Sequence, residues 1–163
     1  MRPLVASDIE KVRVWRNSDH VRTQMIFREI ISESQQIDWF RRAQLRGEEH
    51  FIYSFRGHDV GLLSLKPASS GTSFEGGIFC GEKSFLGDPL NLHAVLWLYD
   101  LAFGKREMKI ATIQVLASNS TAMRLNQFIG FREISRDSRG VVTFQLDREQ
   151  YVLQRAKNFP GAR

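Results

Sequence analysis

Apolar residues recur at helical spacing through the first fifty positions, after a short extended stretch at Arg2–Val5. The spacing predicts three helices: residues 9–17, residues 21–26, and a segment between a cap at residues 32–35 and Gly47. Before the first helix, Ser7-Asp8-Ile9-Glu10 has the form of a capping box, in which the serine and glutamate side chains bind N–H groups of the first turn. The N-terminal third is therefore predicted to be mostly helical.

The period changes to that of strands near residue 50. Stretches rich in Phe, Ile, Tyr, Val and Leu predict strands over residues 50–56, 60–66 and 73–80. Gly57-His58-Asp59 has the composition of a three-residue hairpin connection. The pair Gly76-Gly77 inside the third strand indicates a bulge, or backbone that a ligand approaches closely. These strands are predicted to form an antiparallel meander.

The second half alternates between helix and strand. Asp88-Pro89 is a typical helix start, with aspartate at the N-cap and proline at the first helical position. The predicted elements are a largely buried helix over 90–103, a strand over 110–116, a helix from Asn119 or Ser120 to Gly130, and a hairpin of strands 131–134 and 141–146. A meander followed by a strand–helix–strand crossover predicts an α/β (α+β) fold, with a mixed sheet and helices on both faces.

Composition narrows the class of protein. The 163 residues fit a single domain, residues 1–163. The lone cysteine, Cys80, excludes an internal disulfide, and the four histidines lack metal-ligand spacing, so no metal is expected. The sequence shows neither a charged-then-apolar leader nor an apolar run of membrane-spanning length. We therefore expect a cytoplasmic protein that does not contact a membrane.

The net charge of +5 is compatible with several kinds of binding partner. Basic residues are interspersed with acidic ones, and no tract of like charges forms an arm for nucleic acid, so nucleic acid is not expected. A solvated, mildly basic surface is one interpretation of the excess. The alternative interpretation is that the excess positive charge binds a small molecule that carries phosphate groups.

Two motifs resemble the GCN5-related N-acetyltransferases (GNATs), which use acetyl-CoA. The stretch Val115-x-x-x-Asn119-x-x-Ala122-x-x-Leu125-x-x-x-x-Gly130-Phe131 is similar to their late strand–helix–strand segment, and Glu75-x-Gly77-Ile78-Phe79 is similar to their fourth strand. The predicted order of elements agrees along nearly the whole chain. The resemblance implies a GNAT-like fold with a mostly antiparallel, twisted sheet.

A further motif is similar to one branch of this superfamily. It consists of Trp15-Arg16-Asn17, followed by Val21-Arg22, Met25 and Trp39-Phe40. That branch includes the N-acetyltransferases of the pseudaminic-acid pathway, which acetylate a UDP-linked amino sugar, and the acetyltransferases of ribosomal-protein N-termini.

The resemblance implies acetyl-CoA as cofactor. Its pantetheine arm is expected in a gap between the fourth and fifth strands, bound to the backbone of Ile78, Phe79 and Cys80. The other expected cofactor-binding residues are Leu86, Gly87, Asp88, Leu90, Asn91, Asn119 and Ala122. The usual phosphate loop, Arg/Gln-x-x-Gly-x-Gly/Ala, is altered here: Pro89 removes an N–H donor and Asp88 adds negative charge. If Asp88 turns inward as the N-cap, its carboxylate occupies amides that a phosphate would bind.

The catalytic positions are also implied by the resemblance. Glu75 lies at the usual acidic position of the fourth strand and is expected to act as the base, directly or through water. The usual acid is a tyrosine directly after Leu125, where this chain has Asn126, whose amide can donate a hydrogen bond to the sulfur. Ser118, Tyr99 or water is the alternative proton donor.

The acceptor is expected to be a small molecule, with a nucleotide-linked amino sugar of the surface-glycan or flagellin-glycan type favoured. The expected substrate-binding residues are Trp15, Arg16, Asn17, Arg22 and Trp39, because stacking suits a base and guanidinium groups suit a diphosphate. Acetylation of a protein N-terminus or another small amine stays open, as does a non-catalytic acyl-CoA-binding protein. A homodimer also stays open.

Overall fold

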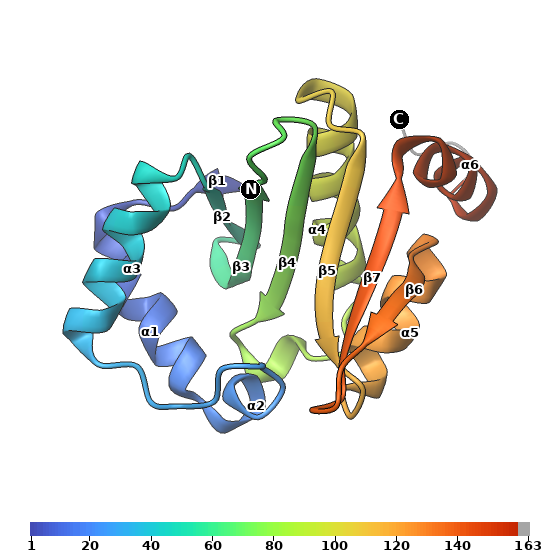
Figure 1. The fold of residues 1–163 in the computed structure, drawn as a ribbon. Helices are drawn as coiled ribbons and strands as arrows, with labels where there is room; N and C mark the ends of the chain where they lie inside the picture. Colours follow the sequence, from blue (N-terminus) through green and yellow to red (C-terminus); the bar gives the residue numbers. More distant parts are fainter. Residues whose placement is uncertain (160–163) are drawn as a thin grey trace.

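A computed structural model describes residues 1–159, and its strands form one sheet in the order β1-β2-β3-β4-β5-β7-β6 (Figure 1). The strands are β1 (Arg2–Pro3), β2 (Glu49–Phe55), β3 (His58–Pro67), β4 (Ser73–Cys80), β5 (Ile110–Leu116), β6 (Arg132–Arg136) and β7 (Val141–Asp147). Neighbouring strands are antiparallel except β4 and β5, which are parallel. The predicted mixed, mostly antiparallel sheet is confirmed.

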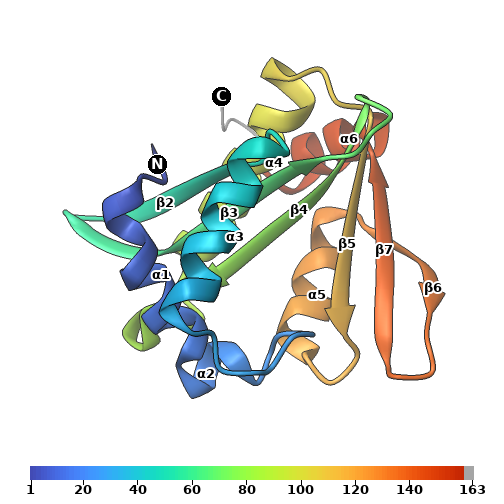
Figure 2. The same cartoon turned by 60° about the vertical axis from the view of Figure 1, so that its left-hand side comes forward.

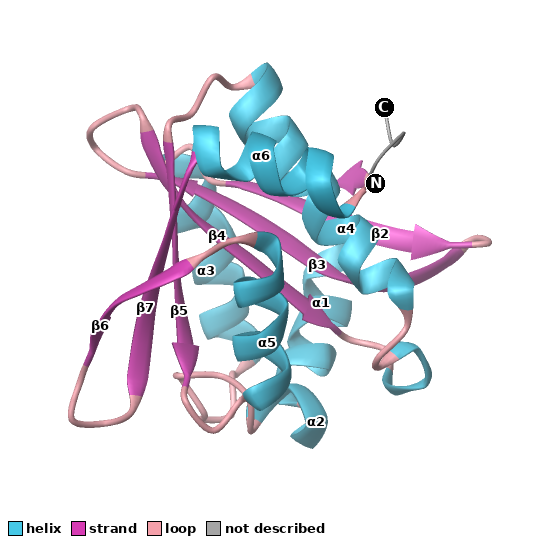
Figure 3. Ribbon diagram, turned by 90° about the vertical axis from the view of Figure 1, so that its right-hand side faces the viewer, coloured by secondary structure: helices cyan, strands magenta, loops and turns pink. Residues whose placement is uncertain are grey.

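Helices cover both faces of this sheet (Figures 2 and 3). One face carries α1 (Ile9–Asn17), α2 (Asp19–Arg22) and α3 (Glu33–Leu45). The other carries α4 (Pro89–Tyr99), α5 (Ser120–Ile129) and α6 (Arg148–Asn158). Short helical turns at Ala6–Asp8 and Lys83–Phe85 precede α1 and α4, and a π-helical segment, Asp100–Lys105, continues α4.

Each face of the sheet has its own hydrophobic core. The larger core joins α4, α5 and α6 to the sheet and contains Phe74, Tyr99, Phe103, Phe144 and Tyr151, all 3% exposed or less. The smaller core joins α1 to the other face and contains Leu4, Val12, Trp15, Ile52 and Leu62, with Trp39, Phe40 and Phe79 packed against it. The smaller core packs α1 and α3, which carry most of the predicted substrate-binding residues, against the sheet.

Several predicted element ends are confirmed by their hydrogen bonds. Ser32 and Gln35 form a reciprocal capping box at the start of α3. Asn119 caps α5 by accepting a hydrogen bond from the Ala122 N–H at 3.0 Å. Gly130 ends α5 with φ of 113°, a left-handed conformation that favours glycine. These caps depend only on residues within one helical turn.

The predicted capping box at Ser7 is wrong. Ser7 lies inside the turn Ala6–Asp8, and the carboxylate of Asp8 accepts a hydrogen bond from the Val5 N–H at 3.0 Å. Arg2 donates two more hydrogen bonds to this carboxylate, at 2.6 and 2.8 Å. Asp8, the last residue of the turn, therefore caps its start in place of Ser7, and the ion pair with Arg2 of β1 holds its carboxylate in position.

Two other boundaries differ from the prediction. Helix α2 spans Asp19–Arg22 and not residues 21–26, because extended Ser18 starts a new helix and the chain after Arg22 is bound to α1 and α2. The β2–β3 turn has two residues, Arg56 and Gly57, with φ of 48° and 83°. Positive φ at both positions fits the two-residue turns that follow the natural twist of a hairpin.

Helix α6 was not predicted from the sequence. Asp147 caps it by accepting the Gln150 N–H at 2.8 Å. Tyr151 anchors it to the larger core, donating a hydrogen bond to Asp100 Oδ1 at 2.7 Å. The predicted buried helix over 90–103 is also longer than expected, because α4 continues through Lys105 with a changed hydrogen-bond pattern.

Candidate active site

Strands β4 and β5 separate after a short parallel ladder. They pair over Ser73–Glu75 and Ile110–Thr112 only. Beyond this point β4 stays paired with β3 as far as Cys80, and β5 stays paired with β7 as far as Leu116, while the two strands diverge (Figure 1). In a strand, backbone N–H and C=O groups point to both sides, so the β5-facing groups of residues 76–80 have no ladder partner in β5. The predicted pantetheine-binding residues Ile78, Phe79 and Cys80 lie in this separated part.

The connection from β4 to α4 lies at the open end of the separated strands. Asp88 Oδ1 accepts a hydrogen bond from the Leu90 N–H at 2.7 Å, so Asp88 is the N-cap, as predicted. Gly87 has φ of 78°, and a side chain there would meet nothing within 4 Å. The N–H groups of Leu86, Asp88 and Asn91 also bind carbonyls within the loop. Backbone N–H groups that the family resemblance would assign to phosphate binding are therefore already hydrogen-bonded within the loop and the cap.

Asn91 joins this loop to the rest of the protein. Its Nδ2 donates to Phe85 O at 2.7 Å, and its Oδ1 accepts from the buried Tyr53 hydroxyl at 2.7 Å. Burial raises the pKa of Tyr53, so the phenol keeps the proton that it donates. The predicted cofactor-binding residue Asn91 thus shapes the loop through its side chain.

The predicted residues of α5 are joined by hydrogen bonds along one side of the helix. Asn119 Oδ1 accepts from the Ala122 N–H, and Ala122 O accepts from Asn126 Nδ2 at 2.8 Å. Asn126 is 8% exposed, whereas Ser118 is exposed in the turn before the helix. An amide has two N–H donors, so Asn126 keeps a second one.

Tyr99 lies beneath β4 where the two strands begin to separate. It is 1% exposed, and a side chain at Gly76 would come 3.0 Å from its hydroxyl oxygen. A side chain at Gly76 would therefore require the buried ring of Tyr99 to shift. The continuous β3–β4 register excludes a bulge at Gly76-Gly77, which was one of the two predictions for this pair. Burial raises the pKa of Tyr99.

Glu75 lies on the opposite face of β4, toward α1 and α3. It is the last β4 residue paired with β5, and its Oε1 accepts from Lys66 Nζ at 2.6 Å. Lys66 lies directly opposite on β3. The predicted base is therefore at the point of strand separation, about half-exposed, with a lysine beside it.

The aromatic residues expected to bind substrate pack against other side chains, with Trp15 buried and Trp39 partly buried. Trp15 is 5% exposed, donates from Nε1 to Glu82 Oε1 at 2.8 Å, and packs edge-on against Phe79. Trp39 of α3 packs edge-on against the ring of His50, with ring centroids 4.8 Å apart. Both rings fix the position of a helix against the sheet.

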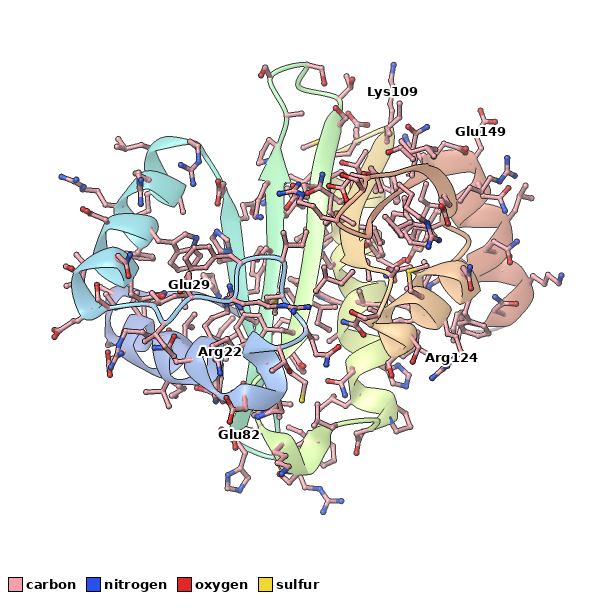
Figure 4. The ribbon with its side chains drawn as sticks, turned by 60° about the horizontal axis from the view of Figure 1, so that its bottom comes forward. Arg22, Glu29, Glu82, Lys109, Arg124 and Glu149 are labelled. Carbon is pink, nitrogen blue, oxygen red and sulfur yellow. The ribbon has the colours of Figure 1, made fainter. Side chains whose placement is uncertain are left out.

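The polar residues expected to bind substrate differ in whether their side-chain N–H groups have hydrogen-bond partners. Asn17 exchanges two hydrogen bonds with the backbone of Ile31, and Arg22 donates to Asp19 and to Arg28 O. Within residues 1–159, Arg22 Nε and Arg16 Nη1 are buried without a hydrogen-bond partner. Burial lowers the pKa of Arg16. Arg22 on α2 and Arg124 on α5 lie on opposite sides of the separated strands (Figure 4).

One polar cluster was missed by the sequence prediction. His50 Nδ1 lies 3.0 Å from Ser64 Oγ, and His50 Nε2 lies 3.0 Å from Glu48 Oε2. The only sequence signal is a histidine at an inward position of a strand, and the cluster forms because His50 and Ser64 are opposite each other in the β2–β3 register.

The described residues, 1–159, contain neither a cluster of metal-ligating side chains nor a membrane-spanning helix. No group of three or more His, Cys, Asp or Glu side chains is placed to hold a metal ion. No helix in this part of the chain has the length and apolarity needed to cross a membrane.

Comparison with known proteins gives structural matches only. No protein-family model and no curated protein matches the sequence significantly. A spermidine N-acetyltransferase from Vibrio cholerae, solved with CoA and spermine, matches with a TM-score of 0.81 and 16% identity, over 93% of this chain and 96% of that chain. An aminoglycoside acetyltransferase solved with coenzyme A matches with a TM-score of 0.80 and 16% identity, over 94% and 97% of the two chains. A nucleotide-linked sugar GNAT matches with a TM-score of 0.78 and 18% identity, over 96% and 90%.

These matches cover nearly the whole length of both chains in each pair. At such identities they establish the fold, and they agree with the expectation from the Asn119–Phe131 and Glu75–Phe79 motifs. The chain has the fold of the GCN5-related N-acetyltransferases.

Proposed function

We propose that this protein is an acetyl-CoA-dependent N-acetyltransferase. The observation that carries the proposal is the end of the β4–β5 ladder at Glu75 and Thr112, in a fold shared with acetyltransferases solved with CoA. An extended pantetheine arm can bind strand backbone as an added strand does. The backbone of Ile78, Phe79 and Cys80 is available for this in the separated part of β4.

The pyrophosphate of the cofactor is proposed to bind at Leu86–Asn91. The N-terminus of α4 has a partial positive charge that suits an anion. The open space at Gly87 supports close approach of a phosphate, and Asn119 and Ala122 at the start of α5 would contact the cofactor from the other side. Asp88 opposes this binding through its charge, so we expect moderate affinity.

The reaction needs few catalytic side chains: a base for the amine and a hydrogen-bond donor for the sulfur. Bound acetyl-CoA would supply the thioester that the acceptor amine attacks. Glu75 would attract the ammonium form of the acceptor and accept a proton from it. The second N–H of Asn126 would hydrogen-bond the departing sulfur, and the exposed hydroxyl of Ser118 is the alternative donor.

A nucleotide-linked amino sugar is the proposed acceptor. Arg16 lies one turn after Val12 on the side of α1 that packs toward the sheet, and its Nη1 is buried without a partner within residues 1–159. A buried N–H group of a guanidinium without a hydrogen-bond partner costs free energy, which a phosphate would recover. Arg22 Nε offers a second buried donor. Trp15, Asn17 and Trp39 would support this pocket by positioning α1, the segment before α3, and α3.

The likeness to a nucleotide-linked sugar GNAT supports this choice of acceptor. A polyamine would bring positive charge toward Arg16, which disfavours it. Acetyl-CoA and nucleotide sugars are cytoplasmic metabolites, so we place the reaction in the cytoplasm.

The test measures thiol release from acetyl-CoA with a UDP-linked amino sugar, spermidine, an aminoglycoside and a short peptide. We expect the nucleotide sugar to react fastest and UDP alone to raise the melting temperature. Arg16→Met should raise the KM for the nucleotide sugar about 30-fold or more, as expected for loss of a buried charge pair. The KM for acetyl-CoA should stay unchanged.

Arg41→Met is the matched control, because Arg41 lies 72% exposed on α3 in a surface pair with Asp38. Efficient acetylation of peptides with no response to UDP would identify a protein acetyltransferase instead. Binding of acetyl-CoA without turnover of any amine would identify a non-catalytic acyl-CoA-binding protein.

A further inference from the structure

A hydrogen-bonded chain crosses the sheet from β2 toward β4. Glu48 Oε2 is 3.0 Å from His50 Nε2, and His50 Nδ1 is 3.0 Å from Ser64 Oγ. His50 is 8% exposed and the Glu48 side chain 7% exposed. An acid, an imidazole and a hydroxyl in this order are the parts of a proton relay.

The chain ends beside the surface on which Glu75 lies. Ser64 is opposite His50 on one side and opposite Gly77 on the other. A side chain built at Gly77 would meet only Ser64 within 4 Å, at 3.7 Å from its Cβ and 4.0 Å from its Oγ. Because side chains alternate along a strand, Glu75 and Gly77 share one face of β4. The Ser64 hydroxyl and the Glu75 carboxylate therefore border the same open stretch, next to the end of the β4–β5 ladder.

The surroundings of His50 keep the ring neutral near pH 7. Burial lowers its pKa, and Lys66 on β3 and Arg46 before β2 act in the same direction, while Glu48 opposes them. Trp39 of α3 covers the ring, and Ser64 contacts its other nitrogen. With Glu48 accepting from Nε2–H, the lone pair on Nδ1 is directed to Ser64. The ring can then accept a proton through the serine.

The proposed reaction needs more than one proton acceptor. An ammonium group carries three N–H bonds and the product amide carries one, so two protons leave the nitrogen. Glu75 is proposed for the first proton, and one of its oxygens is already bound to Lys66. Asn126, at the position of the usual tyrosine, has a neutral amide side chain that cannot take the second proton.

We propose that Ser64 is a further catalytic residue that contacts the acceptor amine, and that His50 and Glu48 act through it to remove the second proton. This inference rests on the proposed acetyltransferase function. As the C–N bond forms, the amine N–H bond breaks and its proton moves to Ser64 Oγ. The Ser64 O–H proton moves to His50 Nδ1, giving an imidazolium paired with Glu48.

The departing thiol and the solvent account for the remaining electron pair and protons. The C–S electron pair leaves with the sulfur, and the thiolate takes a proton from solvent. Glu75 and His50 return their two protons to solvent after the product leaves. The net change is ammonium plus thioester to amide, thiol and one proton.

The experiment compares Ser64→Ala, Ser64→Thr and His50→Gln with the wild type, using whichever amine of the four-compound panel reacts fastest. Ser64→Ala and His50→Gln should lower kcat about 10²–10⁴-fold, the range for a positioned acid–base group, with the KM for acetyl-CoA unchanged. Ser64→Thr keeps the hydroxyl and should recover most of the rate.

The pH profile separates a relay from a packing role. The pKa of His50, measured by NMR in the free protein, should coincide with an ionisation on the acid side of the wild-type kcat/KM profile. That ionisation should be missing in His50→Gln. Ser54→Ala is the control, because Ser54 also loses one side-chain hydrogen bond in the sheet, to Asp59 at 2.7 Å, at the hairpin end of β2. It should keep the wild-type rate.

Wild-type rates in both Ser64→Ala and His50→Gln would overturn the relay and leave the proposed function intact. A lower rate in Ser64→Ala and His50→Gln, with the acid-side ionisation still present in His50→Gln and with Ser64→Thr inactive, would show that these residues act only in packing. That result would also overturn the relay. A wild-type protein that neither binds acetyl-CoA nor acetylates any amine would overturn the proposed function and the relay with it.

Discussion

Glu75 shows how a single residue acquires its setting from its neighbours. It is the last β4 residue paired with β5, so backbone pairing holds it on one side and the strands open on the other. Lys66 neutralises its charge at 2.6 Å. An approaching ammonium group would compete with Lys66 for the same carboxylate, which makes this ion pair part of the proposed acceptor site.

Glu75→Gln tests the role of this carboxylate. The amide keeps the size of the side chain and removes its basicity, so kcat should fall about 10²–10⁴-fold. The affinity for acetyl-CoA, measured by calorimetry, should hardly change, because the proposed cofactor contacts are made by backbone. In the double variant with His50→Gln, the rate should be lower than in either single variant, since the two groups are proposed to take different protons.

Glu49→Gln is the matched control for this experiment. Glu49 is also a strand glutamate in an ion pair with a basic residue, Arg106 at 2.7 Å, but it lies on β2. It should retain the wild-type rate. A Glu75→Gln protein with wild-type kcat would remove Glu75 from the mechanism.

At the scale of elements, the start of α4 serves two purposes that conflict. The Asp88 carboxylate caps the helix through the Leu90 N–H, which stabilises the fold. The same negative charge and the same amide are disadvantages for a pyrophosphate at the helix N-terminus. Substitutions at Asp88 can separate these effects, because charge and hydrogen-bond acceptance differ between side chains.

Asp88→Asn keeps an acceptor for the cap and removes the charge. We expect nearly unchanged stability and tighter acetyl-CoA binding. Asp88→Ala removes both, and should lower the free energy of unfolding by about 0.5–2 kcal/mol, the usual cost of losing an N-cap. Calorimetric titration with acetyl-CoA and urea unfolding measure the two quantities.

Asp147→Asn controls for charge removal at a helix cap. Asp147 caps α6 in the same way, with the Gln150 N–H at 2.8 Å, and α6 lies away from the β4–α4 loop (Figure 3). Its acetyl-CoA affinity should equal that of the wild type. Weaker binding in Asp88→Asn would show that the carboxylate helps to hold the loop in a binding conformation.

At the scale of the whole molecule, an ion network joins the N-terminus to the β2–β3 hairpin. Arg2 binds both Asp8 and Asp59, and Lys11 binds Asp59 at 2.7 Å. Burial alone would raise the pKa of Asp59, but hydrogen bonds from Lys11, Ser54 and Arg2 outweigh it and lower this pKa to about 2. The network connects β1 and α1 to β3, which is far from both in the sequence.

This network predicts how stability depends on pH. A carboxyl group with a lowered pKa in the folded state contributes stability above its unfolded pKa, here 3.8, and loses it as the pH falls toward about 2. We expect Asp59 to contribute about 2 kcal/mol to the free energy of unfolding at neutral pH. The free energy of unfolding should therefore fall between about pH 4 and pH 2, as measured by urea unfolding across this range.

Asp59→Asn should be less stable than the wild type at pH 6, and the difference should shrink as the pH approaches 2. Asp38→Asn is the control, because Asp38 is 54% exposed in a surface pair with Arg41, and such pairs contribute little. A constant difference between wild type and Asp59→Asn at all pH values would show that packing, and not charge, explains the loss.

Features that act within one helical turn could be predicted from the sequence. The caps at Ser32, Asp88 and Asn119 and the left-handed Gly130 follow from side chains and backbone groups two to four residues apart. Strand β4 and strand β5 have the predicted bounds, because their apolar runs end at turn residues. The order of these elements, with two short motifs, was enough to indicate the fold.

The candidate site depends on contacts that no local pattern contains. Lys66 meets Glu75, and Ser64 meets His50, only because the strand register places them opposite each other. Ser7 loses its capping role because Asp8 pairs with Arg2 across the start of the sheet. Trp15 is buried because Phe79 and Gly81 come from β4 and its following loop. Local hydrogen bonds and hydrophobic periodicity thus act within a segment, whereas the pairing of charges and proton carriers follows from packing the whole sheet.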